Sequence, residues 1–230
     1  MAKFHFVEDY ERYVRHLMRR HPIDEAMSLA VGGDYAEIGA IECEILRHAG
    51  LRDGDSLVDF GCGSGRLAVR LAETVRVDYL GLDVVRPLLD YARTKCPPHY
   101  RFQLNTSLRL PVETGAVDWF AAFSVFTHLL HTETYLYLEE MHRALRPGGR
   151  VVASFLEFAV YPHWGVFRET VEQQRASHVP HINQFIERNA WELWARELGF
   201  AAVAFVDGLA APWPSGRILG QSVAVLTKAA

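Results

Sequence analysis

The sequence has little of what marks a secreted, membrane-bound or nucleic-acid-binding protein. Its three cysteines, Cys43, Cys62 and Cys96, are far apart and form no Cys-x-x-Cys pair, which favours reduced thiols and a cytoplasmic location. The chain lacks a run of about 18 apolar residues, and its N-terminus lacks the basic-then-apolar layout of an export signal. The formal net charge is only −4, so no positive excess favours nucleic acid. We therefore expect a soluble cytoplasmic protein that binds neither a membrane nor nucleic acid.

Apolar residues, in contrast, are plentiful enough for one substantial core. Half of the 230 residues are hydrophobic, and a chain of this length commonly folds as one domain. The sequence contains no repeat, low-complexity tract or linker, which supports the same expectation.

The most informative stretch runs from Val58 to Arg66 and reads Val-Asp-Phe-Gly-Cys-Gly-Ser-Gly-Arg. Its first residues belong to a short apolar run that is typical of a buried strand. Apolar side chains recur at helical spacing after its last residue. Glycine permits positive φ and a close approach of a ligand, and a helix N-terminus carries partial positive charge. Gly61, Gly63 and Gly65 therefore predict a cofactor site between strand and helix. The alternative is an ordinary glycine-rich turn.

The spacing of the glycines narrows the class of cofactor. A dinucleotide-binding fold uses Gly-x-Gly-x-x-Gly, and Arg66 occupies the third glycine position of that pattern. Asp59 stands two residues before the first glycine, where a carboxylate repels a pyrophosphate and suits a cation. The stretch thus predicts a positively charged cofactor.

These residues resemble the glycine-rich loop of class I S-adenosylmethionine-dependent methyltransferases, whose cofactor carries an ammonium and a sulfonium group and no phosphate. Two later stretches resemble the same family: Ser124 to Leu129, and Arg143 to Val151, which reads Arg-x-Leu-x-Pro-Gly-Gly-x-Val. The resemblance covers about Ile38 to Thr227. It implies an α/β fold with a doubly wound, seven-stranded, mostly parallel sheet, an antiparallel seventh strand, helices on both faces and an N-terminal helical lid.

Within a single domain of residues 1–230, the resemblance assigns 1–50 to the lid, 51–156 to the cofactor-binding core, 157–186 to a substrate cap and 187–230 to a closing helix and strand hairpin. Hydrophobic periodicity predicts strands over 56–60, 77–82, 100–104, 117–123, 151–155, 201–206 and 222–227. It predicts helices over 8–20, from Pro22 toward Gly32, over 38–49, after the glycine loop, over 86–93, from a Thr132 cap to Arg146, and over 190–198.

Two polar residues stand where predicted strands end. Asp83 ends the second strand, where a carboxylate can accept hydrogen bonds from both hydroxyls of a ribose; its alternative role is to cap the next helix. Asn105 takes the place where the family often has an acidic residue for the adenine amino group, although it also suits an ordinary turn. The resemblance assigns to the cofactor Asp59, Gly61, Cys62, Gly63, Gly65, Asp83, Val84, Asn105, Thr106, Ser107, Phe123 and Ser124.

Histidines are the candidates for proton transfer. Methyl transfer from a sulfonium is an in-line displacement, so the protein must position the acceptor, exclude water and, for a hydroxyl, remove a proton. Neutral imidazole suits proton removal near neutral pH. The candidate bases are His128, His131, His163 and His181, and each has a structural role as its alternative. An amine acceptor that reacts unprotonated needs no base.

Two further chemistries are disfavoured. His128 and His131 have ligand-like spacing on a helix, but no third Cys, Asp or Glu ligand can be assigned to them. We therefore expect no metal. The Asn/Asp-Pro-Pro-aromatic turn of enzymes that methylate base amines is absent after the fourth predicted strand, so we expect a small-molecule acceptor.

The substrate-selecting segments leave alternatives open. Residues 157–186 are rich in aromatics and histidines, which suits either a cap over a moderately polar small molecule or a contact in a homodimer. Tyr35, near Gly32 and Gly33, is a candidate lid residue or an aromatic that packs a loop.

Three functional interpretations follow. The first is a methyltransferase that uses S-adenosylmethionine, releases S-adenosylhomocysteine and methylates a hydroxyl or amine of a small molecule. The second is aminopropyl transfer on the same fold, which calls for extra carboxylates that Ser124 to Leu129 does not supply. The third is a partner protein that binds the cofactor without catalysis.

Overall fold

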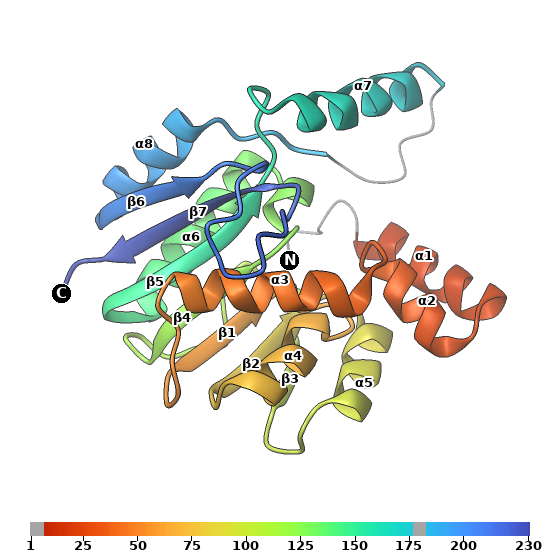
Figure 1. Ribbon diagram of the computed structural model, residues 1–230, viewed down its shortest axis with the longest axis horizontal. Helices are drawn as coiled ribbons and strands as arrows, with labels where there is room; N and C mark the ends of the chain where they lie inside the picture. Colours follow the sequence, from red (N-terminus) through yellow and green to blue (C-terminus); the bar gives the residue numbers. More distant parts are fainter. Residues whose placement is uncertain (1–6, 177–182) are drawn as a thin grey trace.

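The computed structural model describes residues 7–176 and 183–230 of the chain. One seven-stranded sheet runs through it in the order β3-β2-β1-β4-β5-β7-β6 (Figure 1). The strands are β1 (Ser56–Phe60), β2 (Asp78–Asp83), β3 (Arg101–Leu104), β4 (Val117–Ala122), β5 (Leu145–Phe155), β6 (Phe200–Val206) and β7 (Ser222–Lys228). β7 is antiparallel to both β5 and β6, whereas the other pairs are parallel. The predicted α/β sheet is confirmed, including its antiparallel seventh strand.

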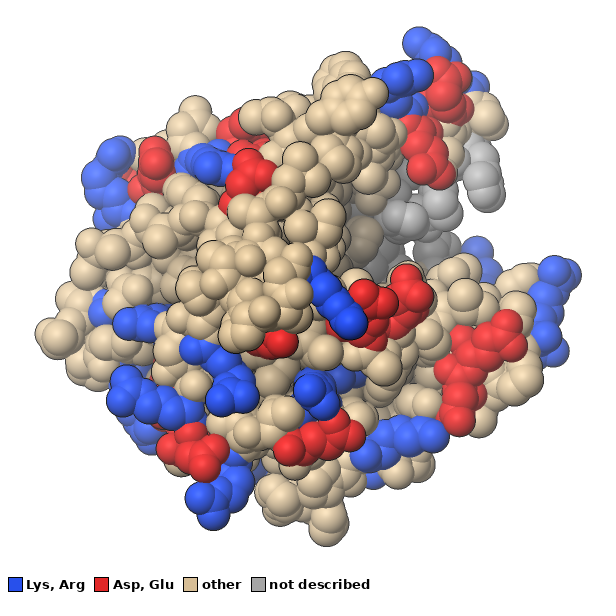
Figure 2. Space-filling model, viewed as in Figure 1, with Lys and Arg blue, Asp and Glu red and all other residues tan. Residues whose placement is uncertain are grey.

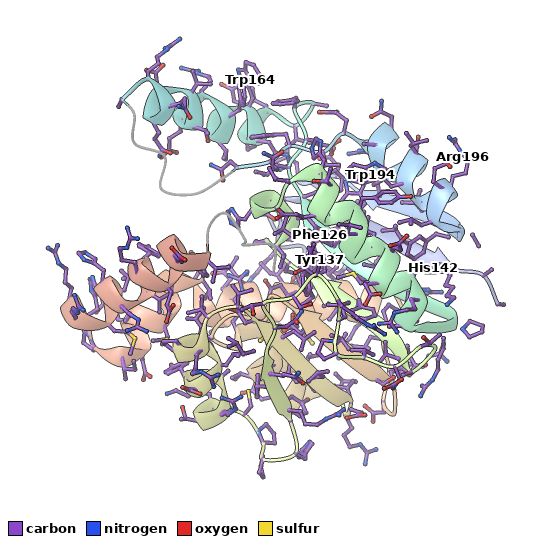
Figure 3. All side chains as sticks on the ribbon, turned by 180° about the vertical axis from the view of Figure 1, so that it is seen from behind. Phe126, Tyr137, His142, Trp164, Trp194 and Arg196 are labelled. Atoms are coloured by element: carbon purple, nitrogen blue, oxygen red, sulfur yellow. The ribbon has the colours of Figure 1, made fainter. Side chains whose placement is uncertain are left out.

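Alternate strand residues face two separate apolar layers. Leu57 of β1 packs with the helices α3 (Tyr35–His48), α4 (Arg66–Thr74) and α5 (Arg86–Lys95). Val58, one residue later, packs with α6 (His131–Ala144) and α8 (Arg188–Leu198) on the opposite face. Phe126 and Tyr137 belong to this second layer, and Figure 3 labels both of them near α6. Because both faces are covered, the central strands are buried along their length, as apolar runs in a parallel sheet predict.

The sheet has a switch point between β1 and β4. Chain connections from β1 lead to β2 and β3 on one side, and β4 and β5 extend the sheet on the other. In open α/β sheets, ligands bind at the carboxyl ends of the strands beside such a reversal. The glycine loop follows β1 directly, so it lies at this point.

Two N-terminal helices pack beside the loop rather than on the sheet. α1 (Val7–Arg20) and α2 (Ile23–Ala30) share an apolar cluster with Val85 and Leu88 at the start of α5. The cluster contains Val14 and Leu17 of α1 and Met27 of α2. This packing brings the N-terminal helices to the carboxyl edge of the sheet (Figure 1).

Two local predictions are wrong. Thr132 does not cap α6, which begins at His131, and the Glu133 carboxylate instead accepts the Leu130 N–H at 2.9 Å. α6 ends at Ala144 and not at Arg146, because Leu145 already pairs with Val117 of β4 as the first residue of β5.

A further helix, α7 (Tyr161–Arg175), occupies a segment for which no element was predicted. Its single buried residue is His163, and it stands away from the body of the molecule (Figures 1 and 3). Figure 2 shows a hollow between α7 and the N-terminal helices. In the described ranges, no helix has the length and apolar character needed to cross a membrane.

Candidate active site

A cavity of about 560 Å³ lies at the carboxyl ends of β1, β2 and β4 and extends under the N-terminal helices. Most of the residues expected to hold the cofactor line it, namely Asp59, Gly61, Cys62, Gly63, Asp83, Val84, Asn105, Phe123 and Ser124. Gly65, Thr106 and Ser107 are not among its described lining residues. The volume is in the range of pockets that enclose a small organic ligand.

The glycine loop uses its amide groups within the protein. The N–H groups of Gly61 and Cys62 both donate to the Leu82 carbonyl, at 2.8 and 3.0 Å. Gly63 N–H donates to Asp83, and Gly65 N–H donates to the Cys62 carbonyl. A phosphate cradle needs such donors aimed at the ligand. The loop is therefore unsuited to a pyrophosphate, as the absence of the dinucleotide spacing predicts.

All three glycines have positive φ, and each avoids a different contact. A Cβ at Gly61 would lie 2.3 Å from Val125, and one at Gly63 would lie 2.6 Å from Val31, both cavity-lining residues. Gly65 is different, since its Cβ would lie 2.9 Å from the Cβ of Ala92 on α5. Gly65 thus allows close packing of α4 on α5 rather than an approach to the cavity.

Asp83 is buried at the end of β2 with both carboxylate oxygens engaged. Oδ2 accepts the Gly63 N–H at 2.9 Å, and Oδ1 accepts the Val85 N–H at 2.8 Å. Each carboxylate oxygen offers about two acceptor positions, so capacity for two vicinal hydroxyls remains. The helix-cap alternative is not realised in full, because α5 has Val85 at its N-cap with no side-chain cap. Burial raises the pKa of Asp83 to about 6, although the backbone donors lower it.

Asp59 is the second carboxyl of the cavity and is almost fully buried. Its Oδ2 accepts the Tyr79 hydroxyl at 2.7 Å. Burial raises the pKa of Asp59 to about 7, and the Tyr79 hydrogen bond opposes that rise. A buried carboxyl without a cationic partner in contact is costly to ionise. Two such groups in one cavity therefore favour a ligand that brings positive charge and ribose hydroxyls, which fits S-adenosylmethionine.

Asn105 lines the cavity but also behaves as a turn residue. Its amide donates to the Ser107 carbonyl at 3.1 Å, and its Oδ1 accepts the Ser107 N–H at 3.4 Å. The Ser107 carbonyl also accepts the Tyr137 hydroxyl at 3.2 Å. The two alternatives predicted for Asn105 therefore coexist at one position.

The candidate histidines differ in their position relative to the cavity. His128 lines the cavity. His131 lies outside it and contacts the Phe185 carbonyl through Nε2 at 3.0 Å. His163 is buried with both ring nitrogens engaged, since Nε2 is 3.1 Å from the Gly220 carbonyl and Nδ1 is 3.1 Å from the Glu157 N–H. His181 lies outside the described residues. His131 and His163 thus have structural contacts and do not face the cavity.

The N-terminal helices are tied to the glycine loop by polar contacts. Ser64 Oγ donates to the Met27 carbonyl at 2.9 Å, and the Tyr35 hydroxyl donates to the Ser64 carbonyl at 2.8 Å. Arg66 Nη1 donates to the Val31 carbonyl at 2.6 Å. Tyr35 is not among the described lining residues, so its contact is that of an aromatic packing the loop.

Sequence reasoning missed one charged pair in the cavity. Glu42 of α3 is buried, and its Oε1 accepts hydrogen bonds from Arg66 Nε and Nη2 at 2.9 and 2.5 Å. Burial raises the pKa of Glu42 despite the nearby guanidinium. A signal was present, because Glu42 is a lone acid next to Ile41 and near Ile45 on the apolar face of its helix.

No cluster of three or more His, Cys, Asp or Glu side chains suited to a metal ion occurs in the described part of the chain. Gln221, just before β7, is a further cavity residue that the sequence did not indicate.

Comparisons with known proteins agree with this site. A family model described as "Methyltransferase domain" matches residues 57–149. The demethylmenaquinone methyltransferase of Lactococcus lactis is 25% identical over 179 residues, which are 71% of this chain and 69% of the relative. The biotin biosynthesis bifunctional protein BioHC of Cellvibrio japonicus is 29% identical over 155 residues, 67% of this chain and 29% of that protein. The chain spans less than half the length of the first two curated relatives that it matches.

Among solved structures, a methyltransferase of Thermotoga maritima described as a possible histamine N-methyltransferase superposes with a TM-score of 0.66. The two are 18% identical, and the match covers 97% of this chain and 99% of the other. At that identity the likeness shows a shared fold. The family match over residues 57–149, with the glycine loop inside it, identifies a class I S-adenosylmethionine-dependent methyltransferase domain in this chain. The resemblance noted in the sequence is confirmed, and the cofactor of this family is the predicted one.

Proposed function

We propose that the protein transfers a methyl group from S-adenosylmethionine to a hydroxyl or amine of a small molecule and releases S-adenosylhomocysteine. The observation that carries the proposal is the presence of two buried carboxyls, Asp59 and Asp83, in one cavity. The amides of Gly61, Cys62, Gly63 and Gly65 beside it already donate within the protein. The cofactor, when bound, supplies an electrophilic methyl group on a cationic sulfur.

The residues of this chain have distinct tasks in that reaction. In this proposal Asp83 accepts the ribose hydroxyls and Asp59 adds negative charge opposite a cationic ligand, and the lining of the cavity by both residues supports these roles. The N-terminal helices cover the cavity and keep water from the reacting atoms, which favours in-line transfer in a fixed orientation. For a hydroxyl acceptor, we assign proton removal to His128, and its position in the cavity lining supports this choice.

Isothermal titration with S-adenosylmethionine and S-adenosylhomocysteine is the first test. We expect both to bind with a stoichiometry of one, and failure of both to bind would remove the proposal. Incubation with methyl-labelled cofactor and a metabolite extract separates catalysis from binding. Transfer of label supports the enzyme, whereas binding without transfer supports the alternative of a non-catalytic partner. A parallel incubation with decarboxylated S-adenosylmethionine that is labelled in its aminopropyl chain tests the other group transfer, which transfer of that label would indicate.

The same extract tests His128. We expect His128→Asn to lose label transfer to hydroxyl acceptors while cofactor affinity is kept. The matched control is His131→Asn, because His131 lies outside the cavity.

A further inference from the structure

Three polar side chains from three neighbouring strands meet at one wall of the cavity. Ser124 follows β4, Ser154 lies near the end of β5, and Gln221 immediately precedes β7. Because β4, β5 and the antiparallel β7 are adjacent in the sheet, these positions share one edge. Ser124 and Gln221 line the cavity, whereas Ser154 is fully buried behind them.

The hydrogen bonds of this wall fix the orientation of the Gln221 amide. Ser154 Oγ accepts the Ser124 N–H at 2.7 Å, so its own hydrogen is available to donate. It donates to Gln221 Oε1 at 2.7 Å. The amide nitrogen of Gln221 therefore faces Ser124 and donates to its Oγ at 3.1 Å. The assignment of the amide oxygen and nitrogen thus follows from the backbone N–H of Ser124.

The backbone on both sides of the wall is held as well. His163 Nε2 lies 3.1 Å from the Gly220 carbonyl and donates to it, which fixes the residue before Gln221. Ser124 has a φ of 57°, a left-handed conformation that is unfavourable for a residue with a Cβ. Non-glycine residues with positive φ persist where the surroundings enforce them and are frequent at functional sites. Here the short bond to Ser154 enforces it.

Counting hydrogens shows what the wall offers to a ligand. Gln221 Nε2 carries two hydrogens, and the bonds recorded within the described residues use one of them. Once Ser124 Oγ accepts that bond, the hydroxyl hydrogen of Ser124 has only a 3.4 Å contact with Gln221 Oε1. Two donors thus lie side by side on the cavity wall. They suit an oxygen or nitrogen atom that presents a lone pair.

The charges of the cavity favour a particular state of that ligand. The charged residues among the described lining are Glu42, Asp59, Asp83 and Arg66, and the guanidinium of Arg66 is already engaged by Glu42. An anionic group placed here would face the carboxylates without a free guanidinium among those residues.

We propose that Gln221 and Ser124 form a donor pair that binds the lone pair of an uncharged hydroxyl or amine and so orients the methyl acceptor. Ser154 acts as a positioning residue for Gln221. This inference rests on the proposed methyltransferase function and adds the polar class of the acceptor and the residues that recognise it.

The test uses nuclear magnetic resonance of the ¹⁵N-labelled protein saturated with S-adenosylhomocysteine, at pH 8. The side-chain amide signals of Gln221 are those that disappear in Gln221→Leu. Phenol, imidazole and ethanolamine are titrated as probes, with toluene as the apolar control. We expect at least one polar probe to shift the Gln221 amide signals, and toluene to leave them unchanged.

Two variants separate the donor role from a structural one. Gln221→Leu should weaken binding of that probe about three- to tenfold, which is the range for the loss of one neutral hydrogen bond. Gln221→Glu keeps an oxygen for Ser154 but has no N–H, so it should weaken phenol or imidazole to a similar degree. The matched control is Gln103→Leu on β3, which lies outside the cavity lining and should bind the probes as the wild type does.

Several results would overturn the inference. These are the absence of any shift of the Gln221 amide signals with all three polar probes, equal probe affinity in both Gln221 variants and the wild type, or an equal response to toluene. Affinity for S-adenosylhomocysteine, measured first, should be the same in each variant. Loss of that affinity in the wild type would defeat the proposed function, whereas intact cofactor binding with no response from Gln221 would defeat this inference alone.

Discussion

The backbone N–H of Gly63 donates a hydrogen bond of 2.9 Å to the Asp83 carboxylate, so the glycine loop after β1 is tied to the end of β2. The same carboxylate accepts the Val85 N–H at 2.8 Å. The proposed ribose acceptor therefore also fixes the loop on which the cofactor would lie. Loss of this carboxylate removes a ligand contact and loosens the cavity wall together.

The first prediction follows from that double role. Asp83→Ala should weaken binding of S-adenosylhomocysteine by about 1 to 3 kcal/mol, through lost charge-assisted hydrogen bonds. Isothermal titration measures the change. Asp90→Ala is the matched control, because Asp90 is an α5 carboxylate that pairs with Arg93 at 2.6 Å, is largely exposed and lies outside the cavity. Equal affinity in the two variants would place the ribose elsewhere.

The second prediction concerns Asp59 and pH. Its pKa rises from 3.8 to about 7 in the folded protein, so the folded state holds this proton more tightly than the unfolded state does. The contribution of this protonated carboxyl to the free energy of unfolding is complete below pH 3.8 and is lost as the pH rises through about 7. A cationic ligand favours the ionised form, so its binding should release a proton. We expect S-adenosylmethionine to bind about tenfold more weakly at pH 6 than at pH 8, measured by titration in buffers of different ionisation enthalpy.

Asp59→Asn tests the cause of that pH dependence. The amide oxygen of asparagine can still accept the Tyr79 hydroxyl, but it needs no ionisation. At pH 8 the variant should therefore unfold at a higher urea concentration, with a gain of up to about 4 kcal/mol, while it binds S-adenosylmethionine more weakly and with a flatter pH profile. Asp78→Asn, an exposed β2 carboxylate that pairs with Arg101, should change neither property. An unaltered pH profile in Asp59→Asn would assign the proton to another group.

Local patterns sufficed to predict the strands and the glycine loop. β1 matches its predicted bounds because a short apolar run before glycines has few alternatives. Leu57 and Val58 are both buried, on opposite faces of the sheet, as expected of a sheet covered on both faces. α7 was not predicted, because His163 is its one buried residue and its sequence lacks an apolar stripe. A helix that buries almost none of its side chains needs no periodic apolar face, so the sequence pattern does not indicate it.

The cavity was predictable in part for a different reason. Asp59 and Asp83 each stand at the end of a recognisable strand, so their meeting follows from the topology. Glu42 and Arg66 are 24 residues apart, and Ser124 and Gln221 are 97 residues apart. Their contacts depend on how α3 and β7 dock in space, which no local pattern specifies. The end of α6 likewise depends on the pairing of Leu145 with Val117.

The third prediction concerns the buried pair between α3 and α4. Glu42→Ala leaves the Arg66 guanidinium with the Val31 carbonyl as its remaining recorded partner, so it should destabilise the protein by about 3 to 5 kcal/mol. Urea unfolding measures the loss. The exposed pair of Arg70 and Glu73 on α4 provides the control, since Glu73→Ala should cost less than about 1 kcal/mol. Similar costs for the two variants would mean that the Glu42 pair is well hydrated.

The fourth prediction concerns the contact between the glycine loop and the segment after α2. Gly63 has a φ of 54°, and a Cβ there would lie 2.6 Å from Val31 Cγ1. Gly63→Ala should therefore push Val31 away from the cavity and weaken S-adenosylhomocysteine binding, beyond the backbone cost of roughly 1 kcal/mol for alanine at positive φ. Adding Val31→Ala removes the clash but leaves the backbone cost, so the double variant should recover part of the affinity. Gly54→Ala is the matched control, because Gly54 also has positive φ but no atom within 4 Å of its Cβ position. If Val31→Ala gives no recovery, backbone strain alone accounts for the loss, and the N-terminal helices do not depend on that glycine for their position over the cavity.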